Sequence, residues 1–309
     1  MDDRARQPRQ NPRFALTVDV EEWFTGVADR PHELDRFESR LHVGMSRCLE
    51  LFERAHTQAT FFFLGYLAER FPSWVKRVAD AGHEVAVHGQ YHVPIGQLTP
   101  SEFRSSVTRA REALLAAGAP RVSGFRAPVF SLDSRTAWAL DVLEELGFEY
   151  DSSLFPIYNP RYGEPHAPRL PFRPTRSGKL VEFPMSTANV LGLRMPFSGG
   201  FYLRALPLSL VQLGFRRCLE QREPAVCYVH PWELDPEQPP LPGSRLARLR
   251  HRVGLDGVGA KLEALLSEFE FAPMTEVLRW HAASTKQPLL RLLRPLPGLP
   301  RPDTGQPHT

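Results

Sequence analysis

Residues 14–19 read Phe-Ala-Leu-Thr-Val-Asp, a short apolar run that ends in an acidic residue. Two similar runs follow, Ala-Thr-Phe-Phe-Phe-Leu at 59–64 and Glu-Val-Ala-Val-His at 84–88. Short runs rich in β-branched and aromatic residues are typical of buried strands. Because each interval leaves room for one helix, the sequence predicts repeated strand–helix units.

Apolar residues at helical spacing fill these intervals. Leu41, Met45, Leu49 and Phe52 recur three or four residues apart, and Thr99 begins a capping box for a later helix. The expected strands are 14–19, 59–64, 84–88, 121–125, 148–151, 180–183 and 225–229, and the expected helices are 41–55, 67–81, 100–117, 134–146 and 206–220.

Alternation of strands and helices predicts a parallel sheet covered by helices. The handedness of such connections leaves a doubly wound sheet or a (β/α) barrel. In both folds the catalytic residues collect at the carboxyl ends of the strands. Residues 155–174 contain six prolines, which predicts a long loop over one mouth of the sheet.

The length, charge and cysteine content of the chain disfavour several classes of function. The chain has 309 residues, enough for one large domain or two small ones, with 38 basic and 35 acidic side chains and a net charge of +3. This near balance does not indicate a nucleic-acid partner, so the basic stretch 245–252 is interpreted as a solvated helix face. The cysteines, which lack CxxC spacing, predict buried structural thiols at Cys48, Cys218 and Cys227.

No apolar run is long enough to predict a membrane span. The N-terminal residues show no apolar signal-peptide region, so a cytoplasmic protein is expected. Polar, proline-containing residues 1–12 predict a disordered lead-in, and the Pro/Arg-rich residues 286–309 predict a flexible tail.

Titratable residues stand at the expected strand ends. Asp19 and Glu21 alternate along an extended chain and so point the same way. His88 and His92 are four residues apart, a spacing that lets two imidazoles reach one ion on a helical turn, although surface histidines often share it. The other strand-end candidates each have a plainer structural alternative and are Arg126, Asp151 and His230.

Six stretches, in order, resemble the polysaccharide deacetylases of the NodB-homology kind, carbohydrate esterase family four. They are TVDVEEW (17–23), ATFFFLGYLAERFP (59–72), AGHEVAVHGQYH (81–92), GFRAPVFS (124–131), GFEYDSS (147–153) and VHPWE (229–233). EFPMST (182–187), SGGFYLR (198–204) and RLRHRVGLD (248–256) resemble the branch found beside exosortase and exopolysaccharide gene clusters.

The resemblance implies an α/β fold, a distorted (β/α) barrel with an irregular C-terminal extension. It implies one catalytic domain over residues 13–285, of which 155–285 include the elaboration specific to the branch. The implied activity is hydrolysis of N-acetyl groups from amino-sugar units of an exopolysaccharide or its precursor.

The resemblance also implies residue roles. Asp19 matches the catalytic base, His88 and His92 the metal ligands, and Arg126 the arginine that orients the base. The remaining matches are Val129, whose backbone N–H would help hold the oxyanion, His230 as the catalytic acid, and Asp151 as the carboxylate supporting that acid.

One departure concerns the metal. Many family members have two adjacent aspartates where this chain has Asp19 and Val20, so the third ligand must come from elsewhere. Glu21 is the natural choice, and Glu22 is the alternative that strand alternation disfavours. The resemblance implies a divalent metal, with Zn²⁺ as the expected ion.

Aromatic side chains near the predicted mouth are candidates for stacking on a sugar, or for core packing. They are Trp23, Phe130, Tyr162, Phe201 and Trp232. The expected partner is an N-acetylated glycan, with no nucleic acid, and a homo-oligomer stays open. Two alternatives remain at this point, a ring-opening C–N hydrolase like allantoinase and a non-catalytic glycan-binding homologue.

Overall fold

The fold is described from a computed structural model, over residues 14–28, 31–190, 193–284 and 290–291. Its main sheet consists of β1 (Phe14–Val20), β2 (Thr60–Phe63), β3 (Glu84–Val87), β4 (Gly124–Phe125), β5 (Tyr150–Asp151), β6 (Phe172–Arg173), β7 (Val181–Glu182), β10 (Ala225–Val229), β11 (Phe271–Ala272) and β12 (Leu290–Arg291). The strand order is β10-β1-β2-β3-β4-β5-β7-β6-β12, and β11 pairs with β1 off this path. Strands β8 (Thr187–Val190) and β9 (Leu193–Pro196) form a separate antiparallel pair.

Parallel pairing brings most strand ends to one edge. Strand β1 lies between β10 and β2, with Val18 opposite both Val229 and Phe61. The ladder continues in parallel through β3, β4, β5 and β7. Since the described ladder does not join β12 to β10, the sheet is curled but incompletely closed, which confirms the expected distorted barrel of the α/β class.

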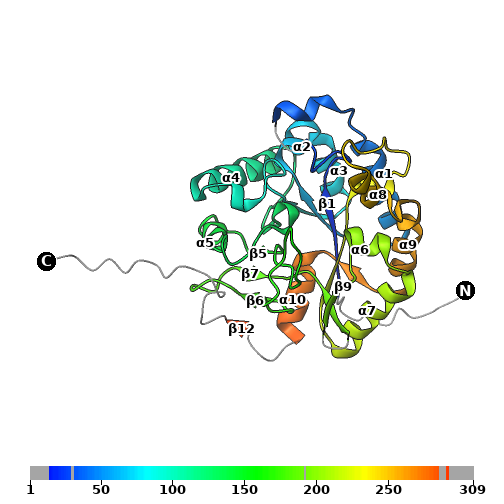
Figure 1. The fold of residues 1–309 in the computed structure, drawn as a ribbon. Helices are drawn as coiled ribbons and strands as arrows, with labels where there is room; N and C mark the ends of the chain where they lie inside the picture. Colours follow the sequence, from blue (N-terminus) through cyan, green and yellow to red (C-terminus); the bar gives the residue numbers. More distant parts are fainter. Residues whose placement is uncertain (1–13, 29–30, 191–192, 285–289, 292–309) are drawn as a thin grey trace, which may run out of the picture.

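Helices cover the outside of this sheet (Figure 1). They are α1 (Leu41–Arg54), α2 (Gly65–Arg70), α3 (Pro72–Asp80), α4 (Pro100–Ala116), α5 (Trp138–Glu145), α6 (Gly200–Ala205), α7 (Leu208–Gln221), α8 (Arg245–Arg252), α9 (Val258–Glu268) and α10 (Met274–Ser284). The capping box at Thr99 and Glu102 is confirmed. The expected single helix over 67–81 is two helices, because Pro72 cannot donate a backbone hydrogen bond and instead begins α3.

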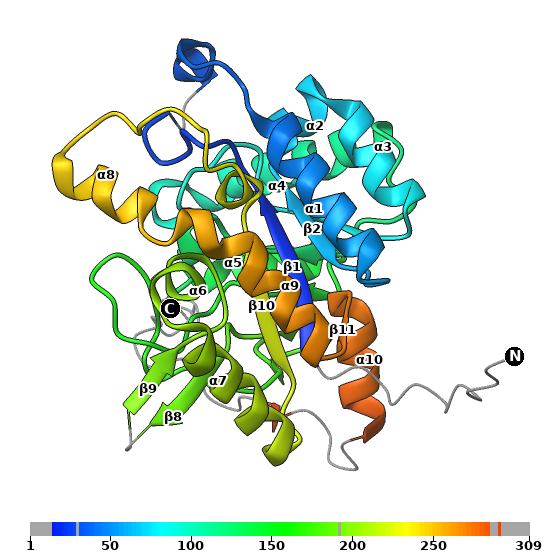
Figure 2. The same cartoon turned by 90° about the vertical axis from the view of Figure 1, so that its right-hand side faces the viewer.

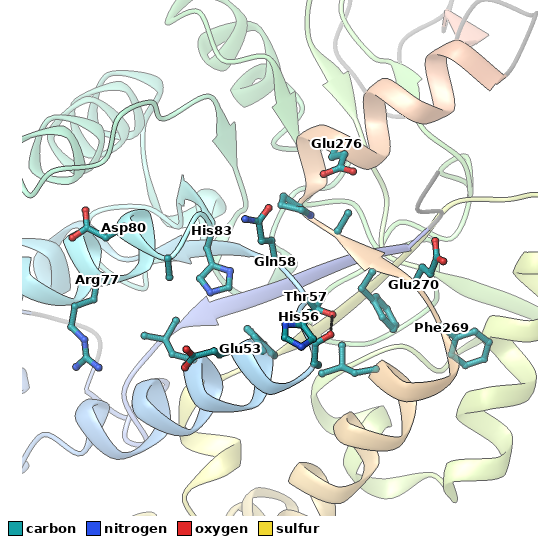
Figure 3. A pocket seen from close by; sticks show the side chains of 18 residues that line it. Glu53, His56, Thr57, Gln58, Arg77, Asp80, His83, Phe269, Glu270 and Glu276 are labelled. Carbon is teal, nitrogen blue, oxygen red and sulfur yellow. Dashed lines mark hydrogen bonds between the residues drawn. The ribbon is translucent and has the colours of Figure 1, made fainter. Parts of the chain in front are cut away.

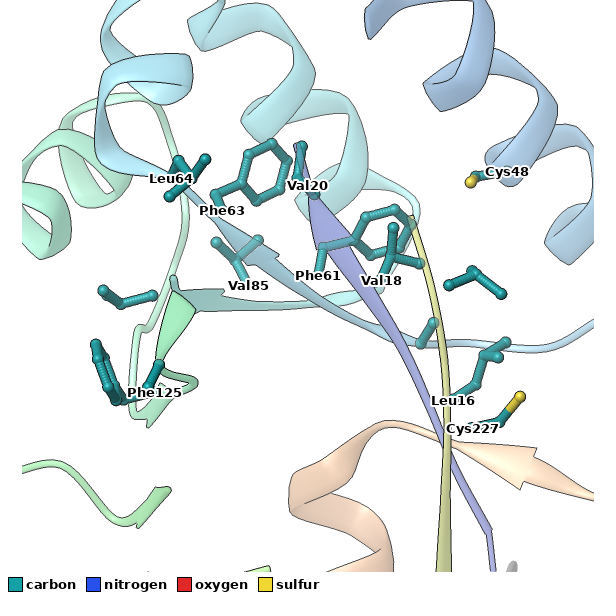
Figure 4. Packing of buried hydrophobic residues seen from close by; sticks show 14 of the residues in the cluster. Leu16, Val18, Val20, Cys48, Phe61, Phe63, Leu64, Val85, Phe125 and Cys227 are labelled. Atoms are coloured by element: carbon teal, nitrogen blue, oxygen red, sulfur yellow. The ribbon is translucent and has the colours of Figure 1, made fainter. Parts of the chain in front are cut away.

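Strand alternation divides the core into two layers. Leu16, Val18 and Val20 face the covering helices, where they pack with Phe61 and Phe63 of β2 (Figure 4). The intervening residues of β1 face the interior of the curled sheet, so the same alternation that buries the valines directs Asp19 inward.

The second half of the chain contributes to the same sheet. Strand β10 pairs with β1 over Phe14–Val18, and β11 pairs with β1 at Phe14 and Ala15. The expected strand 121–125 is shorter, since the backbone N–H groups of Glu149 and Tyr150 both donate to Ser123 and regular pairing begins only at Gly124.

The predicted terminal segments lie largely outside the described residues. Residues 1–12 belong to this group, and in 286–309 only Leu290–Arg291 are described, as a strand paired with β6. Among the described helices, none is both long and apolar enough to cross a membrane.

Candidate active site

Three side chains at the carboxyl ends of β1 and β3 converge on one point. Oε1 of Glu21 lies 3.1 Å from Nε2 of His88 and 3.1 Å from Nε2 of His92. The three ligand atoms lie within 4.8 Å of one another, and all three residues are buried. Two imidazoles and one carboxylate are donors that divalent metal ions use in proteins, so these three side chains could hold such an ion.

The tautomer of His88 fits a bound cation. Its Nδ1 lies 2.8 Å from the backbone oxygen of Arg126, which can only accept, so Nδ1 carries the proton. In the neutral ring, Nε2 then presents a lone pair to the Glu21 carboxylate, an arrangement that a cation between the two atoms would make favourable. A backbone bond on the second nitrogen is also the usual orientation of metal-binding histidines.

The two glutamates after β1 differ in their surroundings. Burial would raise the pKa of Glu21, but His92 and His230 outweigh it and hold this pKa well below its usual value. Glu22 instead accepts hydrogen bonds from the Ser39 hydroxyl and the Arg40 backbone. The geometry therefore places Glu21, and not Glu22, with the two histidines.

Asp19 lies beside this cluster and is bound by Arg126. Nη1 of Arg126 is 2.6 Å from Oδ1 of Asp19 and 2.8 Å from the hydroxyl of Thr17. Nε and Nη2 donate to the backbone oxygen and hydroxyl of Ser152, and the Arg126 side chain is fully buried. Several fixed acceptors therefore hold the guanidinium, which in turn orients the Asp19 carboxylate.

The backbone after Arg126 is strained. Val129 has φ 58° and ψ 17°, and Phe130 follows with φ 50°. A left-handed conformation is unfavourable for a β-branched residue and is found where surrounding structure enforces it, often at functional sites.

His230 follows β10 and faces the cluster from the other side of β1. Its Nε2 lies 3.9 Å from Oε1 of Glu21, and its Nδ1 lies 3.1 Å from Oε2 of Glu233. Burial lowers the pKa of His230, but Glu233 and Glu21 outweigh it and raise this pKa to about 9. The ring is therefore cationic at neutral pH, as a general acid requires.

Sequence reasoning missed Glu233, which contacts His230, and Arg204, which contacts Glu233. Glu233 also accepts from Nε of Arg204 at 2.7 Å, so it lies between two cations. Gly199 and Gly200 let α6 approach Tyr228 of β10, since a β-carbon on Gly199 would meet that ring at 2.2 Å. The three-residue spacing from His230 to Glu233 on a turn could have suggested the pair, whereas no local signal marked Arg204.

The prediction that Asp151 supports His230 is wrong. Asp151 accepts a hydrogen bond from the Ser153 hydroxyl and lies opposite Glu182, its register partner on β7, and Oδ2 of Asp151 and Oε2 of Glu182 each lack a hydrogen-bond partner. Both carboxyls are fully buried, and burial raises the pKa of each, that of Glu182 furthest. Ionising both of two neighbouring buried carboxyls is energetically costly, so the pair favours a state in which it retains one proton.

Two of the aromatic candidates, Trp23 and Phe130, are buried packing residues rather than open platforms. Trp23 is 4% exposed, packs edge-on against Phe24 and Phe37, and donates to the backbone of Glu38. Phe130 is buried among other rings. Trp232 stacks with both His230 and His251. Tyr162, Phe201 and Trp232 are half-buried, and they remain candidates for sugar contact.

A cavity of about 1050 Å³ lies away from this chemistry (Figure 3). Its lining includes Gln58 and His83, which precede β2 and β3. It therefore lies at the amino ends of the strands, opposite to the cluster at their carboxyl ends. All three cysteines are buried and free, as predicted.

Family models match two successive segments. Residues 36–150 match polysaccharide deacetylase, and residues 152–279 match a domain of unknown function, DUF3473. The chain is 31% identical over 143 residues to the peptidoglycan deacetylase of Helicobacter pylori (45% of this chain, 48% of the relative). It is 33% identical over 114 residues to the peptidoglycan deacetylase-like protein FGM2 of Gibberella zeae (36% and 33%). It thus spans less than half the length of these curated relatives.

Solved structures share the fold. A Mycobacterium smegmatis protein provisionally described as a polysaccharide deacetylase has a TM-score of 0.60 at 24% identity, covering 94% of this chain and 96% of its own. An allantoinase has a TM-score of 0.58 at 17% identity, covering 92% and 96%. The first segment holds His88, His92 and Arg126, and the second holds His230. Residues 36–150 are therefore similar to the polysaccharide deacetylase family, and the chain as a whole shares the fold of these solved structures.

Proposed function

We propose that this protein removes N-acetyl groups from amino-sugar units of a glycan in a metal-dependent reaction. The proposed substrate is an exopolysaccharide or its precursor. The observation that carries the proposal is the Glu21–His88–His92 cluster, with Asp19 held by Arg126 on one side and His230 on the other.

Glu21, His88 and His92 would hold a divalent metal, which supplies Lewis acidity toward a water molecule and the acetyl oxygen. Asp19 is placed to take the proton of the attacking water, because the bond from Arg126 holds its carboxylate in a fixed orientation beside the cluster. The turned backbone at Val129 would direct an N–H toward the developing oxyanion.

The leaving amine must be protonated before it departs. The His230 ring, with its pKa raised to about 9, holds a proton at neutral pH and lies across the cluster from Asp19. Different neighbours thus serve the two groups: Arg126 orients the base, and the carboxylates near His230 keep the proton on the acid.

A second candidate is a ring-opening C–N hydrolase, because an allantoinase shares the fold with a similar TM-score. Both reactions hydrolyse an amide-type bond. A purely non-catalytic glycan-binding role is disfavoured, since Asp19, Arg126 and His230 are all present and assembled.

The test is acetate release from N-acetylglucosamine oligomers by the metal-loaded protein, with bound metal assayed alongside. Asp19→Asn is expected to keep the metal and lose activity by about 10²–10⁴-fold. His88→Ala is expected to lose both, whereas His166→Ala, at an exposed histidine, retains both. If metal-free wild type opened a cyclic amide and released no acetate, the ring-opening C–N hydrolase would replace the deacetylase as the proposed function.

A further inference from the structure

Helix α8 exposes two leucines. Leu246 and Leu249 are 75% and 67% exposed, although leucines of a two-turn helix normally face a core. Figure 2 shows α8 projecting from the molecule at the end of the sheet where β1 terminates. Only His251 of this helix is buried, so its packed face is narrow.

The outward face is also strongly basic. Arg245, Arg248 and Arg252 are exposed and, by helical periodicity, flank the two leucines. Residues 245–252 contain four arginines and no acidic residue. Leucines beside arginines, without neutralising carboxylates on the helix, form a surface that is both apolar and cationic.

The helix is anchored to the active-site rim at its other face. The His251 ring stacks on Trp232 with centroids 4.4 Å apart, and Trp232 stacks on His230. Nη1 of Arg204 donates to the backbone oxygens of Arg250, His251 and Val253. These contacts fix which face is turned out, so Leu246 and Leu249 cannot reach the core without breaking them.

We propose that α8 docks on the surface of a bilayer that contains anionic lipids. Arginines pair with lipid phosphates at the headgroup level while leucines enter the acyl boundary, which is the pattern of interfacial helices. Nucleic acid would satisfy the arginines but leave the leucines in water. The exposed face of a two-turn helix is smaller than the roughly 800 Å² of surface that each partner buries in a standard protein interface, which disfavours a protein partner.

Docking through α8 would hold the mouth of the site close to the membrane. This inference rests on the proposed function. Docking of α8 on a membrane indicates that the substrate class is an N-acetylated glycan carried on a lipid anchor. The lipid contact itself requires no catalysis, so it is tested separately from acetate release.

The test is co-sedimentation of the full chain with vesicles of phosphatidylcholine, with and without phosphatidylglycerol. Wild type is expected to bind only the anionic vesicles, and binding should weaken as salt rises. The double variant Leu246→Ser/Leu249→Ser is expected to bind at least about tenfold more weakly. The matched control is Leu210→Ser/Leu213→Ser on α7, whose leucines are 50% and 43% exposed; it should bind like wild type.

Failure of wild type to bind anionic vesicles, or equal binding by the α8 double variant, overturns the proposal. A wild-type dimer in velocity sedimentation without lipid, which the α8 variant converts to monomer, would assign the face to a second copy instead. Acetate release from a soluble oligomer should be unchanged in the α8 variant, which separates a failure of docking from a failure of the proposed function.

Discussion

His230 depends on Glu233 for its charge. The carboxylate lies 3.1 Å from Nδ1 of the ring, and Arg204 holds its other oxygen. Burial alone would favour the neutral imidazole, so the proton at neutral pH is retained through the neighbouring carboxylates.

Glu233→Gln is expected to weaken the proposed acid at alkaline pH. An amide of the same shape carries no charge, so the pKa of His230 falls from about 9 and its proton is lost at lower pH. The alkaline limb of the kcat profile should move down by about one to two pH units. The profile measured with Glu237→Gln, at an exposed neighbour, should coincide with wild type. An unmoved limb in Glu233→Gln would contradict the assignment of the acid.

Sequence reasoning placed the strand-end residues well but not all of their partners. Asp19, Glu21, His88, His92, Arg126 and His230 were identified from strand ends and motifs, and the fold brings them together. The carboxylate for His230 was misassigned because Asp151 and Glu233 both follow strands, and only tertiary packing decides which one reaches the ring.

The β5–β7 pairing sets up a different carboxyl pair. Parallel register puts Asp151 directly opposite Glu182, and the curled sheet buries both. Ser153 and the backbone N–H of Leu154 satisfy one oxygen of each. A shared proton is the remaining way to satisfy the pair.

This pair predicts a pH-dependent stability. The pKa of Glu182 is raised well above 4.5 in the folded state, so its stabilising contribution is complete below that value and is lost as pH rises through the folded pKa. Glu182→Gln provides a permanent donor, so the decline in unfolding free energy above about pH 4.5 should be smaller than in wild type. Urea unfolding across pH, with exposed Glu149→Gln as control, measures this difference. Identical pH dependence of wild type and Glu182→Gln would argue against a shared proton.

Elements in the first half were more predictable than those in the second. Periodic apolar spacing located β1, β2, β3, α1 and α4 because each buries a regular stripe or run. Pairs such as β6 and β7 are two residues long and carry no periodic signal. Their existence depends on the neighbours that pair with them.

At the scale of the molecule, β1 pairs along both of its edges with strands from distant parts of the chain. Residues 60–63 pair on one side and residues 225–229 on the other. The two segments matched by separate family models are thus joined through the strand that carries Asp19.

A chain that ends at residue 151 is therefore expected not to unfold cooperatively. It lacks β10 and β11, so the fully buried strand β1 would present an apolar open edge. Urea unfolding followed by circular dichroism should show no sharp transition, whereas a chain ending at residue 284 should retain one. A sharp transition in the shorter chain would mean that the first segment folds alone.

The position of β10 beside β1 also has a consequence during translation. Asp19 leaves the ribosome more than two hundred residues before His230, yet Asp19 lies on β1 and His230 directly follows the adjacent strand β10. Such long-range contacts form slowly and only after the intervening chain has been made. The candidate site can therefore assemble only after the ribosome has made the chain as far as residue 230.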